Sequence, residues 1–457
     1  MQNKKFGILG LGISGIATVK FLLKQKLQFI AWDDSSDSRK KCESLLKEHK
    51  NSSQIVTKDN EAWQNIDYLV LSPGVPLYFP TPHPLVALAK KHQIKIICDL
   101  ELFYLIYPNH TYIGITGTNG KSTTAALVHH ILHTNNIPAK LVGNIGTPIL
   151  SIEPSKDDIM VIEASSYQLD LIEKLKFNIA ILLNITEDHL DRHGTMANYI
   201  SAKCNIFKNQ TKKELAIINF DNPITKKIFT AITERKIHTI PISTKSKLSK
   251  GISMLDDKIY DNINHNELAI EQNKSLLGTH NFENIVASYS AINSLKKINS
   301  SQIKEAINSY QGLDHRMQYL GMVNNMEFIN DSKATNAEST ENALKVFDNI
   351  YWIVGGLPKA GGITSLHPFF NKIRHAFIIG DAEKAFAKIF DKHSVQYTVA
   401  GSLDKAFELA TNTASQDKGK KIKTILLSPA CASFDQWKNF EERGCFFFNL
   451  AKKYIKK

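Results

Sequence analysis

The sequence predicts an α/β protein made of three successive units. Its length of 457 residues corresponds to roughly three domains at about 150 residues each. Short apolar segments alternate with helical stretches along the chain, and this alternation predicts parallel sheets with right-handed crossovers. Hydrophobic residues make up 43% and charged residues 22% of the chain, which is the balance of a folded soluble protein.

The predicted elements fall into three groups. In the first group, strands are expected at 5–9, 28–32, 68–71 and 94–98, with a helix at 14–26. The second group begins near residue 99, with strands at 112–115, 159–162 and 180–183 and a helix from 121 to about 133. The third group follows a turn at Gly312, with strands at 327–330, 351–354, 376–379 and 424–427. The polar segment 242–271 is expected to form loops and short surface strands.

Composition argues against several classes of protein. The five cysteines are far apart and form no CxxC pair, which disfavours a disulfide framework or a structural zinc site and fits a reducing cytoplasm. The longest charge-free window, 68–89, holds five prolines and cannot be a membrane-spanning helix. An apolar run after Lys4 and Lys5 faintly resembles a signal peptide. Glycines interrupt that run and Lys20 follows it, so we expect a cytoplasmic protein without membrane insertion.

The net charge of +12 comes from 56 basic and 44 acidic residues. Only six of the basic residues are arginine, and the lysines are spread along the chain. Nucleic-acid grooves usually cluster arginine with aromatic residues, so we expect a solvated basic surface and no nucleic-acid partner. The positive charge can still help to attract an anionic substrate.

A glycine-rich turn links the first predicted strand to the first helix. Its sequence is Gly10-Leu11-Gly12-Ile13-Ser14-Gly15, and Asp33 ends the next strand 21 residues after Gly12. Glycines let the backbone approach a ligand, and a helix N-terminus attracts phosphate. Alone, this spacing is typical of dinucleotide enzymes, in which the acid binds a ribose. The motif indicates a nucleotide or phosphate without saying which, and a purely structural turn is the alternative.

A second glycine-rich turn is much more specific. It reads Gly114-Ile115-Thr116-Gly117-Thr118-Asn119-Gly120-Lys121-Ser122 and again lies between a strand and a helix. Backbone N–H groups of such a turn wrap phosphate oxygens, Lys121 would meet the β- and γ-phosphates, and the Ser122 hydroxyl would take Mg²⁺. Ile115 stands where the strict motif has its first glycine, so the turn resembles one branch of the P-loop proteins.

Acidic and histidine side chains follow the next two predicted strands. Glu163 comes directly after 159–162, where a carboxylate can hold the metal of a neighbouring P-loop; a helix cap is the alternative. The following strand ends in Asn184-Ile185-Thr186-Glu187-Asp188-His189-Leu190-Asp191-Arg192-His193, which suggests a second metal or phosphate locus. His189 could ligate Mg²⁺ through a ring nitrogen, an unusual ligand for so hard a cation; a hydrogen-bonded loop histidine is the alternative.

These motifs, with others downstream, resemble those of the Mur ligase family. The first are Gly-Thr-Asn-Gly-Lys-Ser at 117–122, Glu-Ala-Ser-Ser-Tyr-Gln-Leu at 163–169 and the segment 184–193. Farther on come His280-Asn281, Asp314-His315-Arg316, Asp-Ser-Lys-Ala-Thr-Asn at 331–336 and Ser-Pro-Ala-Cys-Ala-Ser-Phe-Asp at 428–435. The motifs occur in the family's order over essentially the whole chain, and the last two look most like those of its D-glutamate-adding branch.

The resemblance implies three domains: a UDP-substrate-binding Rossmann-like domain over 1–98, an ATP-binding P-loop domain over 99–311, and a Rossmann-like C-terminal domain over 312–457 that binds the amino acid. The first glycine-rich turn would then hold the UDP part of a substrate and not a nicotinamide cofactor. The positions that match contacts with this substrate are Ile13, Ser14, Asp33, Asp34, Ser72, Gly74, Asn144, Ser165 and Gln168. Asp34 departs from the family, in which a neutral hydroxyl residue is common at this position.

The resemblance also assigns residues to the other ligands. ATP contacts match Gly117, Thr118, Asn119, Gly120, Lys121, Ser122, Thr123, Asn281, Arg316 and Asp331. Metal ligands match Ser122, Glu163, His189 and Lys203, and catalytic roles match Lys121, His189, Lys203 and Lys333. The D-glutamate pocket matches Thr335, Lys359, Ser433, Phe434 and Phe440. A dicarboxylate needs such a set, with a cation, hydroxyl donors and backbone N–H groups at a turn.

Lys203 matches the carboxylated lysine of the family. By itself, a lysine four residues beyond Tyr199 on a helix would be a solvated charge. The implied role requires a reaction with CO2 that turns the cation into a carbamate able to ligate Mg²⁺. Only the neutral amine reacts in this way, so burial or nearby cations must lower the pKa of this lysine.

The resemblance implies an ATP-dependent amide ligase that adds D-glutamate to UDP-N-acetylmuramoyl-L-alanine through an acyl phosphate, with two Mg²⁺ ions. This reaction belongs to cytoplasmic peptidoglycan precursor synthesis, and hence to cell-wall biogenesis, cell shape and cell division. We expect a monomer with these small-molecule substrates. The alternatives are another Mur ligase or a folylpolyglutamate synthetase, a nicotinamide-dependent oxidoreductase built on the first turn, and a non-catalytic nucleotide-binding protein.

Overall fold

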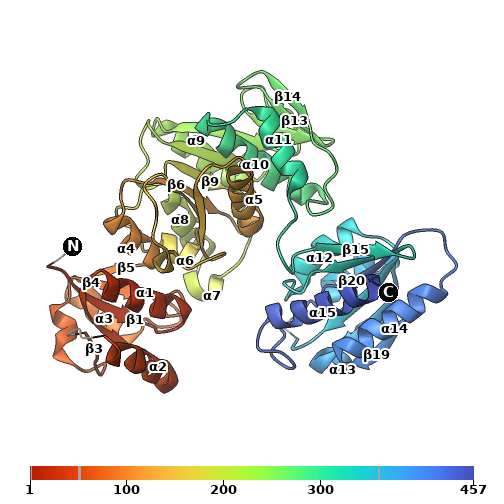
Figure 1. The fold of residues 1–457 in the computed structure, drawn as a ribbon, viewed down its shortest axis with the longest axis horizontal. Helices are drawn as coiled ribbons and strands as arrows, with labels where there is room; N and C mark the ends of the chain where they lie inside the picture. Colours follow the sequence, from red (N-terminus) through yellow and green to blue (C-terminus); the bar gives the residue numbers. More distant parts are fainter. Residues whose placement is uncertain (2, 50–52, 359–360, 457) are drawn as a thin grey trace. The chain divides into compact units, whose positions relative to one another are not determined.

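The computed structural model describes residues 1, 3–49, 53–358 and 361–456. These residues divide into two compact units, 1–270 with 282–307 and 271–281 with 308–457. The described residues form three sheets with flanking helices, two sheets in the first unit and one in the second (Figure 1). The predicted α/β class is therefore confirmed.

The first sheet is parallel, and its strands lie in the order β3-β2-β1-β4-β5. Its strands are β1 (Lys5–Leu9), β2 (Gln28–Trp32), β3 (Gln54–Ile55), β4 (Tyr68–Leu71) and β5 (Lys95–Ile97), with helices α1 (Ile13–Lys24), α2 (Ser36–Lys47) and α3 (Pro84–Lys91). From β1 the chain first adds β2 and β3 on one side of the sheet and then β4 and β5 on the other side. Ligands of such sheets bind at this switch point, outside the carboxyl ends of the strands. The first glycine-rich turn lies there.

The second sheet carries the second glycine-rich turn and has the order β14-β13-β12-β11-β10-β9-β6-β8-β7. Its strands are β6 (Thr111–Thr116), β7 (Ala139–Gly143), β8 (Ile159–Glu163), β9 (Ile179–Leu182), β10 (Leu215–Asn219), β11 (His238–Ser243), β12 (Ile252–Leu255), β13 (Lys258–Asp261) and β14 (Asn266–Ala269). Strands β7 to β10 are parallel to β6 or to one another, so their carboxyl ends meet along one edge. Strands β7, β10 and β11 were not predicted.

The helices of the first unit connect these strands. They are α4 (Asp99–Ile106), α5 (Lys121–Thr134), α6 (Ser166–Leu169), α7 (Leu190–His193), α8 (Met196–Cys204), α9 (Pro223–Glu234), α10 (Thr279–Leu295) and α11 (Ser300–Ser309). The predicted helix 121–133 is confirmed as α5. Among the described residues, no helix combines the length and the apolar character needed to cross a membrane.

The polar segment 242–271 departs in part from its prediction. It forms β12, β13 and β14, which extend the second sheet, with β13 antiparallel to both neighbours. Ile252, Met254 and Ile259 are buried, so these strands are not confined to the surface. Because alternate residues of a strand point to one face, a few apolar residues suffice to bury that face within a polar stretch.

Helix α4 joins the first two sheets. Leu100, Leu102 and Phe103 are buried in a single hydrophobic cluster that includes residues of both sheets. The Glu101 side chain is fully buried, and its carboxylate accepts hydrogen bonds from three successive backbone N–H groups, those of residues 173 (3.0 Å), 174 (2.8 Å) and 175 (2.9 Å). A buried anion is tolerated because these donors replace water.

The second unit contains the third sheet, in the order β15-β16-β20-β17-β18-β19. Its strands are β15 (Gln318–Val323), β16 (Met326–Asn330), β17 (Ile350–Gly355), β18 (Ile373–Ile379), β19 (Tyr397–Gly401) and β20 (Lys423–Leu427), with helices α12 (Ala337–Val346), α13 (Glu383–Lys392), α14 (Leu403–Gln416) and α15 (Phe440–Ile455). All pairs are parallel except β15 with β16. Trp352 and Val354 lie in one core cluster and Tyr351 and Ile353 in another, so both faces of the sheet are covered.

Edge strand β15 was not predicted, although the sequence contains its signal. Asn324 and Asn325 connect β15 to β16, and both have positive φ angles, +49° and +61°. Two such residues are typical of a two-residue hairpin turn.

Replacing Glu101 tests how the first two sheets are joined. Glu101→Ala leaves three backbone N–H groups without their acceptor, so we expect the free energy of unfolding of the first unit to fall by about 3 kcal/mol or more. Glu101→Gln keeps one acceptor oxygen and should lose less. Urea unfolding measures both, with the exposed Glu43→Ala as control; an unchanged midpoint for Glu101→Ala would contradict this role.

Candidate functional site

The second glycine-rich turn lies at the carboxyl end of β6, between the ends of β9 and β8. Gly120 precedes α5 in the left-handed conformation (φ +83°), and a Cβ there would lie 2.4 Å from Asn284 Oδ1, so only glycine fits. Thr118 N donates to Asn184 O (2.8 Å) and Asn119 N donates to Asn184 Oδ1 (2.8 Å). The residues Gly117, Thr118, Asn119, Gly120, Lys121, Ser122 and Thr123 thus form a braced turn at a helix N-terminus, which favours an anion.

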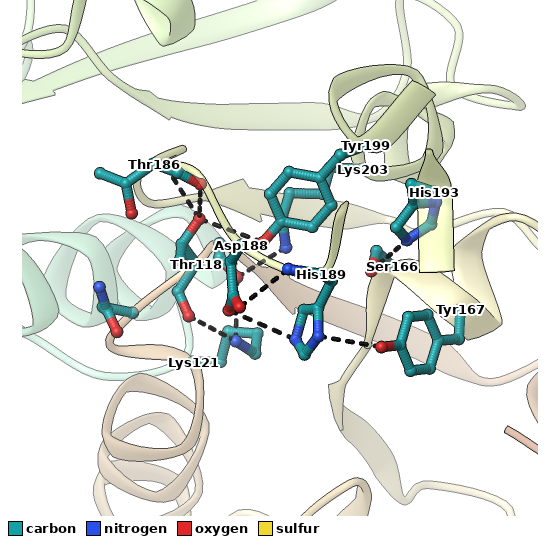
Figure 2. Close-up of polar contacts among 12 residues, drawn as sticks. Thr118, Lys121, Ser166, Tyr167, Thr186, Asp188, His189, His193, Tyr199 and Lys203 are labelled. Atoms are coloured by element: carbon teal, nitrogen blue, oxygen red, sulfur yellow. Dashed lines mark hydrogen bonds and ion pairs between the residues drawn. The ribbon is translucent and has the colours of Figure 1, made fainter. Parts of the chain in front are cut away.

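Two lysine side chains meet at the Gly117 carbonyl of this turn. Figure 2 labels both of them, Lys121 and Lys203. Lys121 Nζ donates to Gly117 O (2.9 Å) and to Thr118 O (2.8 Å). Lys203 Nζ, from α8, donates to the same Gly117 O at 2.7 Å, and its residue is only 1% exposed. The structure therefore brings two of the three predicted catalytic lysines together.

The surroundings of Lys203 change its protonation. Burial, and then the charge of Lys121, lower the pKa of Lys203 to about 7, while Asp188 and Glu163 act in the opposite direction. A lysine in water is almost entirely protonated at neutral pH. Here a substantial fraction of the amine is neutral, which is the form that a reaction with CO2 requires.

Glu163 ends β8 with its side chain almost completely buried. Its Oε2 atom has no hydrogen-bond partner. A buried carboxylate oxygen without a donor is costly unless a cation binds it. Glu163 and the buried Ser122 hydroxyl are oxygen ligands that suit Mg²⁺. Within the described ranges, no group of three or more His, Cys, Asp and Glu side chains is gathered for a metal, so other oxygens would complete such a site.

His189 lies at the start of α7 with a positive φ of 54°. Its Nδ1 atom is 2.9 Å from Tyr167 Oη, and its Nε2 atom is 3.3 Å from Asp188 Oδ2 (Figure 2). Burial lowers the pKa of His189, as do Lys121 and Lys203, against the opposing charge of Asp188. The imidazole is therefore held largely neutral, as a metal ligand or proton acceptor must be.

Several residues around this centre were not assigned roles from the sequence. Thr118 Oγ1 lies 3.1 Å from Tyr199 Oη and accepts from Thr186 N at 3.0 Å. His193 is buried against Ser166, with its Nε2 atom 2.9 Å from Ser166 Oγ, and burial lowers its pKa to about 4. These contacts hold α8 and the segment after β9 against the glycine-rich turn. They link residues far apart in sequence, so spacing alone gave no signal.

The first glycine-rich turn is braced by Asp33 and Ser72. Asp33 Oδ2 accepts from Leu11 N (2.5 Å), Asp33 Oδ1 accepts from Ser35 N (2.7 Å), and Ser72 Oγ donates to Gly10 O (2.8 Å). Both Asp33 oxygens thus serve the backbone, which leaves this carboxylate less available for a ribose. The oxidoreductase alternative loses its main support.

A cleft of about 500 Å³ opens beside this turn, lined by residues that include Gly12, Ile13, Lys20 and Lys41. Ile13 is 83% exposed, an unusual exposure for isoleucine at the start of a helix. Ser14 is half-buried at the same place, and Gly74 is exposed on the segment after β4. The predicted UDP-substrate residues of this domain therefore surround an accessible turn.

Asp34 follows Asp33 but points elsewhere. Its Oδ1 accepts from Trp32 Nε1 (3.1 Å), and its Oδ2 lies 3.2 Å from His83 Nε2. The Trp32 hydrogen bond lowers the pKa of Asp34, as does His83 to a smaller degree, so the carboxylate is ionised. Arg39 donates to the Asp34 carbonyl (3.0 Å) and stacks 4.3 Å from the Trp32 ring. Asp34, which stands where the family commonly has a neutral hydroxyl residue, is thus part of a charged cluster.

The remaining predicted UDP-substrate residues lie at the carboxyl edge of the second sheet. Asn144 is exposed, and its N–H donates to Glu163 O (3.2 Å). Ser165 and Gln168 form a capping box at the start of α6. Gln168 is buried, and its Nε2 donates to Asp99 Oδ1 (2.9 Å), so its amide already has protein partners.

In the second unit, Asp331 follows β16 and is buried. Its carboxylate accepts from Met317 N (3.1 Å) and from Ser428 Oγ (2.7 Å). Burial raises the pKa of Asp331 to about 7, against these hydrogen bonds and the charge of Arg316. Asn281, which the contacts place in the same unit, is buried with its Nδ2 donating to Leu277 O (2.8 Å).

Of the predicted D-glutamate residues that the structure describes, Thr335 follows β16, Ser433 and Phe434 follow β20, and Phe440 begins α15. Lys333 Nζ lies 4.0 Å from the centre of the Phe440 ring. Thr335 is partly buried, Ser433 is buried and Phe434 is 69% exposed. Lys359 lies outside the described residues.

Arg443 in α15 ties these segments together and was missed from the sequence. It is 1% exposed, and it donates from Nε to Ser332 Oγ (3.0 Å) and from one terminal nitrogen to Ser332 O (3.0 Å) and Cys431 O (3.1 Å). Burial lowers its pKa to about 10. The signal was its place on the buried face of a helix, with Phe447 and Ala451 at helical spacing.

Comparison with known proteins identifies the family. Models of the MurD-like N-terminal domain of Mur ligases, the Mur ligase middle domain and the Mur ligase glutamate ligase domain match residues 4–98, 115–292 and 315–431. The chain is 44% identical over 453 residues to the UDP-N-acetylmuramoylalanine–D-glutamate ligase of Rickettsia felis, an alignment that covers 99% of this chain and 98% of that protein. The chain belongs to the Mur ligase family. The protein of the same name from Agrobacterium fabrum is 40% identical, with 98% and 94% covered.

Solved Mur ligase structures share the fold at low sequence identity. UDP-N-acetylmuramate-alanine ligase MurC from Thermotoga maritima has a TM-score of 0.60 at 15% identity and covers 99% of this chain and 100% of that chain. MurF from Acinetobacter baumannii has a TM-score of 0.63 at 14% identity, with 93% and 91% covered. The predicted family and its three-domain α/β fold are confirmed, whereas the exact domain boundaries and the roles of single residues stay predictions.

Replacing Lys121 tests the second glycine-rich turn of this Mur ligase. Its ammonium should matter most when charge redistributes on a transferring phosphoryl group, so Lys121→Ala should lower ATP turnover about 100-fold or more. Binding of the UDP substrate to the first sheet should persist, as measured by calorimetry. Lys212→Ala, an exposed lysine, serves as control. Near-normal turnover of Lys121→Ala would remove the phosphate-binding assignment.

Proposed function

We propose that this chain is an ATP-dependent ligase that joins D-glutamate to UDP-N-acetylmuramoyl-L-alanine, acting as a monomer in the cytoplasm in peptidoglycan precursor synthesis. The observation that carries the proposal is the full-length match to relatives that bear this activity in their names. The braced phosphate turn and the paired lysines supply the chemistry that such a reaction needs. The names of these relatives favour this activity over that of another Mur ligase or of a folylpolyglutamate synthetase.

The reaction proceeds in two balanced steps. The L-alanyl carboxylate attacks the γ-phosphorus of ATP, which forms an acyl phosphate and releases ADP. The D-glutamate amine then attacks the acyl carbon, an amide forms, and phosphate leaves with the bonding electrons while the amine loses a proton. Lys121 and Lys333 neutralise charge on the transferring group, and the turn N–H groups hold the other phosphates.

The first unit fits a divalent cation at the phosphate turn. Glu163 Oε2 lacks a partner, Ser122 offers a hydroxyl and His189 is held largely neutral. Bound there, Mg²⁺ would supply charge stabilisation for phosphoryl oxygens. The buried, partly neutral amine of Lys203 supports a further step, in which its nitrogen adds to CO2 and loses a proton to give a carbamate. The anion would add an oxygen ligand where the chain has too few.

The second unit fits a small dicarboxylate. Ser433 is buried in the segment that follows β20, and Thr335 comes from the segment after β16. Arg443 holds these two segments together through their backbone carbonyls. Lys359, which lies outside the described residues, would supply the cation. Such a set of donors suits the two carboxylates of D-glutamate.

The decisive experiment measures phosphate release from ATP in the presence of UDP-N-acetylmuramoyl-L-alanine and a panel of amino acids. We expect release with D-glutamate and little with L-glutamate, L-alanine or meso-diaminopimelate. Dependence on a different amino acid would make the chain another Mur ligase. A change in nicotinamide absorbance without phosphate release would instead support the oxidoreductase alternative.

Two variants of Lys203 distinguish a carbamate from a plain cation. Lys203→Arg keeps the positive charge but cannot take up CO2, so activity should fall at least about 100-fold. Lys203→Ala should also be inactive, and formate or acetate should restore part of the turnover by supplying the missing oxygen ligand. Turnover with and without these anions is the measurement. An active Lys203→Arg enzyme would contradict the carbamate.

Ser433 tests the D-glutamate pocket. A hydrogen bond to a charged group contributes about 1.5–3 kcal/mol, so Ser433→Ala should raise the KM for D-glutamate about tenfold or more and leave the KM for ATP nearly unchanged. The exposed Ser415→Ala is the matched control. Equal effects on both KM values would show that Ser433 lies outside this pocket.

A further inference from the structure

The second turn of α10 lies against the phosphate turn and carries an acidic residue, Glu283, with two amide partners. Glu283 Oε2 accepts from Asn184 Nδ2 (3.0 Å), and Glu283 Oε1 accepts from Asn219 Nδ2 (2.5 Å). Asn184 follows β9 and Asn219 ends β10, so one carboxylate spans the ends of two neighbouring strands. Neither ATP binding nor metal binding, as described above, uses this residue.

Asn184 connects Glu283 to the phosphate turn. Its Oδ1 accepts from Asn119 N (2.8 Å), and its Nδ2 donates to Asn119 O (3.2 Å) as well as to Glu283. Asn184 therefore binds both the backbone N–H and the backbone carbonyl of Asn119. These two hydrogen bonds form in only one orientation of the Asn184 amide, because rotation by 180° would place a donor against Asn119 N–H.

Both oxygens of Glu283 act as acceptors, so this carboxyl group determines which way its two amide partners face. Glu283 forces the Nδ2 side of both asparagines toward itself. Asn219 is fixed from its other side too, because its Oδ1 accepts from Asp221 N at 2.6 Å. Burial raises the pKa of Glu283 to about 7, against the two amide donors, so the protein maintains an acid here at a cost.

The neighbouring residue reinforces the same contact. Asn284 Oδ1 accepts from Thr124 Oγ1 (3.0 Å) in α5, and it lies where a side chain on Gly120 would be. The second turn of α10 thus holds the phosphate turn through Asn184 and holds α5 directly.

We propose that Glu283 is a positioning residue for nucleotide binding, which acts by fixing the Asn184 amide in the orientation that braces Asn119. The inference rests on the proposed ATP site. Glu283→Gln introduces a donor that must face one of the two asparagine donors. The two facing donors are separated only if the amide of Asn184 or of Asn219 rotates. Rotation breaks either the hydrogen bonds between Asn184 and Asn119 or the one from Asp221 N to Asn219 Oδ1.

A double variant separates this role from a merely structural one. In Asn184→Asp/Glu283→Gln, the carboxylate at 184 can accept from Asn119 N and from the new amide at 283, whose oxygen still accepts from Asn219. Total charge is unchanged and the direction of one hydrogen bond is reversed, while the hydrogen bond to Asn119 O is lost and the one from Asn119 N is kept. A role in packing alone predicts that the second substitution adds to the damage.

The test measures the Kd of Mg-ADP by calorimetry on the full chain, with KM values and thermal midpoints alongside. We expect Glu283→Gln to raise the Kd and the KM for ATP about tenfold, with the KM for D-glutamate within about twofold. The double variant should bind more tightly than Glu283→Gln. Glu305→Gln, the same change at an exposed site of α11, should match the wild type.

The outcomes are separable. Wild-type protein that does not bind Mg-ADP would overturn the proposed function itself. Folded Glu283→Gln that binds as tightly as a competent wild type, or a double variant no tighter than Glu283→Gln, would overturn only the positioning role. If Glu283→Gln does not fold, Glu283→Asp takes its place, because its shorter side chain cannot reach both amides. An unchanged Kd for that variant would equally overturn the role.

Discussion

Two ammonium groups share one backbone carbonyl, that of Gly117, and the chemistry of the first unit depends on this contact. Lys121 is half-buried, whereas Lys203 is buried and cannot be stabilised by water. Burial and the repulsion between the two cations therefore lower the pKa of Lys203. The pKa of Lys203 falls to about 7 as a result. One arrangement therefore provides both a cation for phosphate and a partly neutral, nucleophilic amine. Lysine in water lacks the second property, because it is almost entirely protonated at neutral pH.

The architecture of the second sheet makes this contact possible. Strand β6 lies between β8 and β9, and each strand delivers one polar segment to the same edge: the phosphate turn, Glu163, and the stretch with Asn184 and His189. Helix α8 then returns Lys203 beneath the turn. Because parallel strands align their carboxyl ends, residues from four separate segments meet without any long loop.

The sequence predicted the parts of this site that are local in the chain. The phosphate turn, Glu163 and His189 each follow a recognisable strand, so their meeting at one edge could be inferred. Contacts between distant segments carried no such signal: Glu283 with Asn184, or Arg443 with Ser332, depends on packing that spacing does not encode. Strands β7, β10 and β11 were missed because sequence periodicity does not separate short apolar runs from helix.

Four carboxylates of the first unit differ in whether the chain itself supplies their hydrogen-bond donors. Glu101 accepts three backbone N–H groups, Asp33 accepts two, and Glu283 accepts two amides, so each of these anions is satisfied by the chain. Glu163 is buried, as Glu101 is, yet its Oε2 atom has no donor. An anion left incomplete beside a phosphate turn costs stability unless a ligand completes it. Hydrogen-bond satisfaction, more than residue type, thus distinguishes the acid available to a cation from the acids that hold the fold.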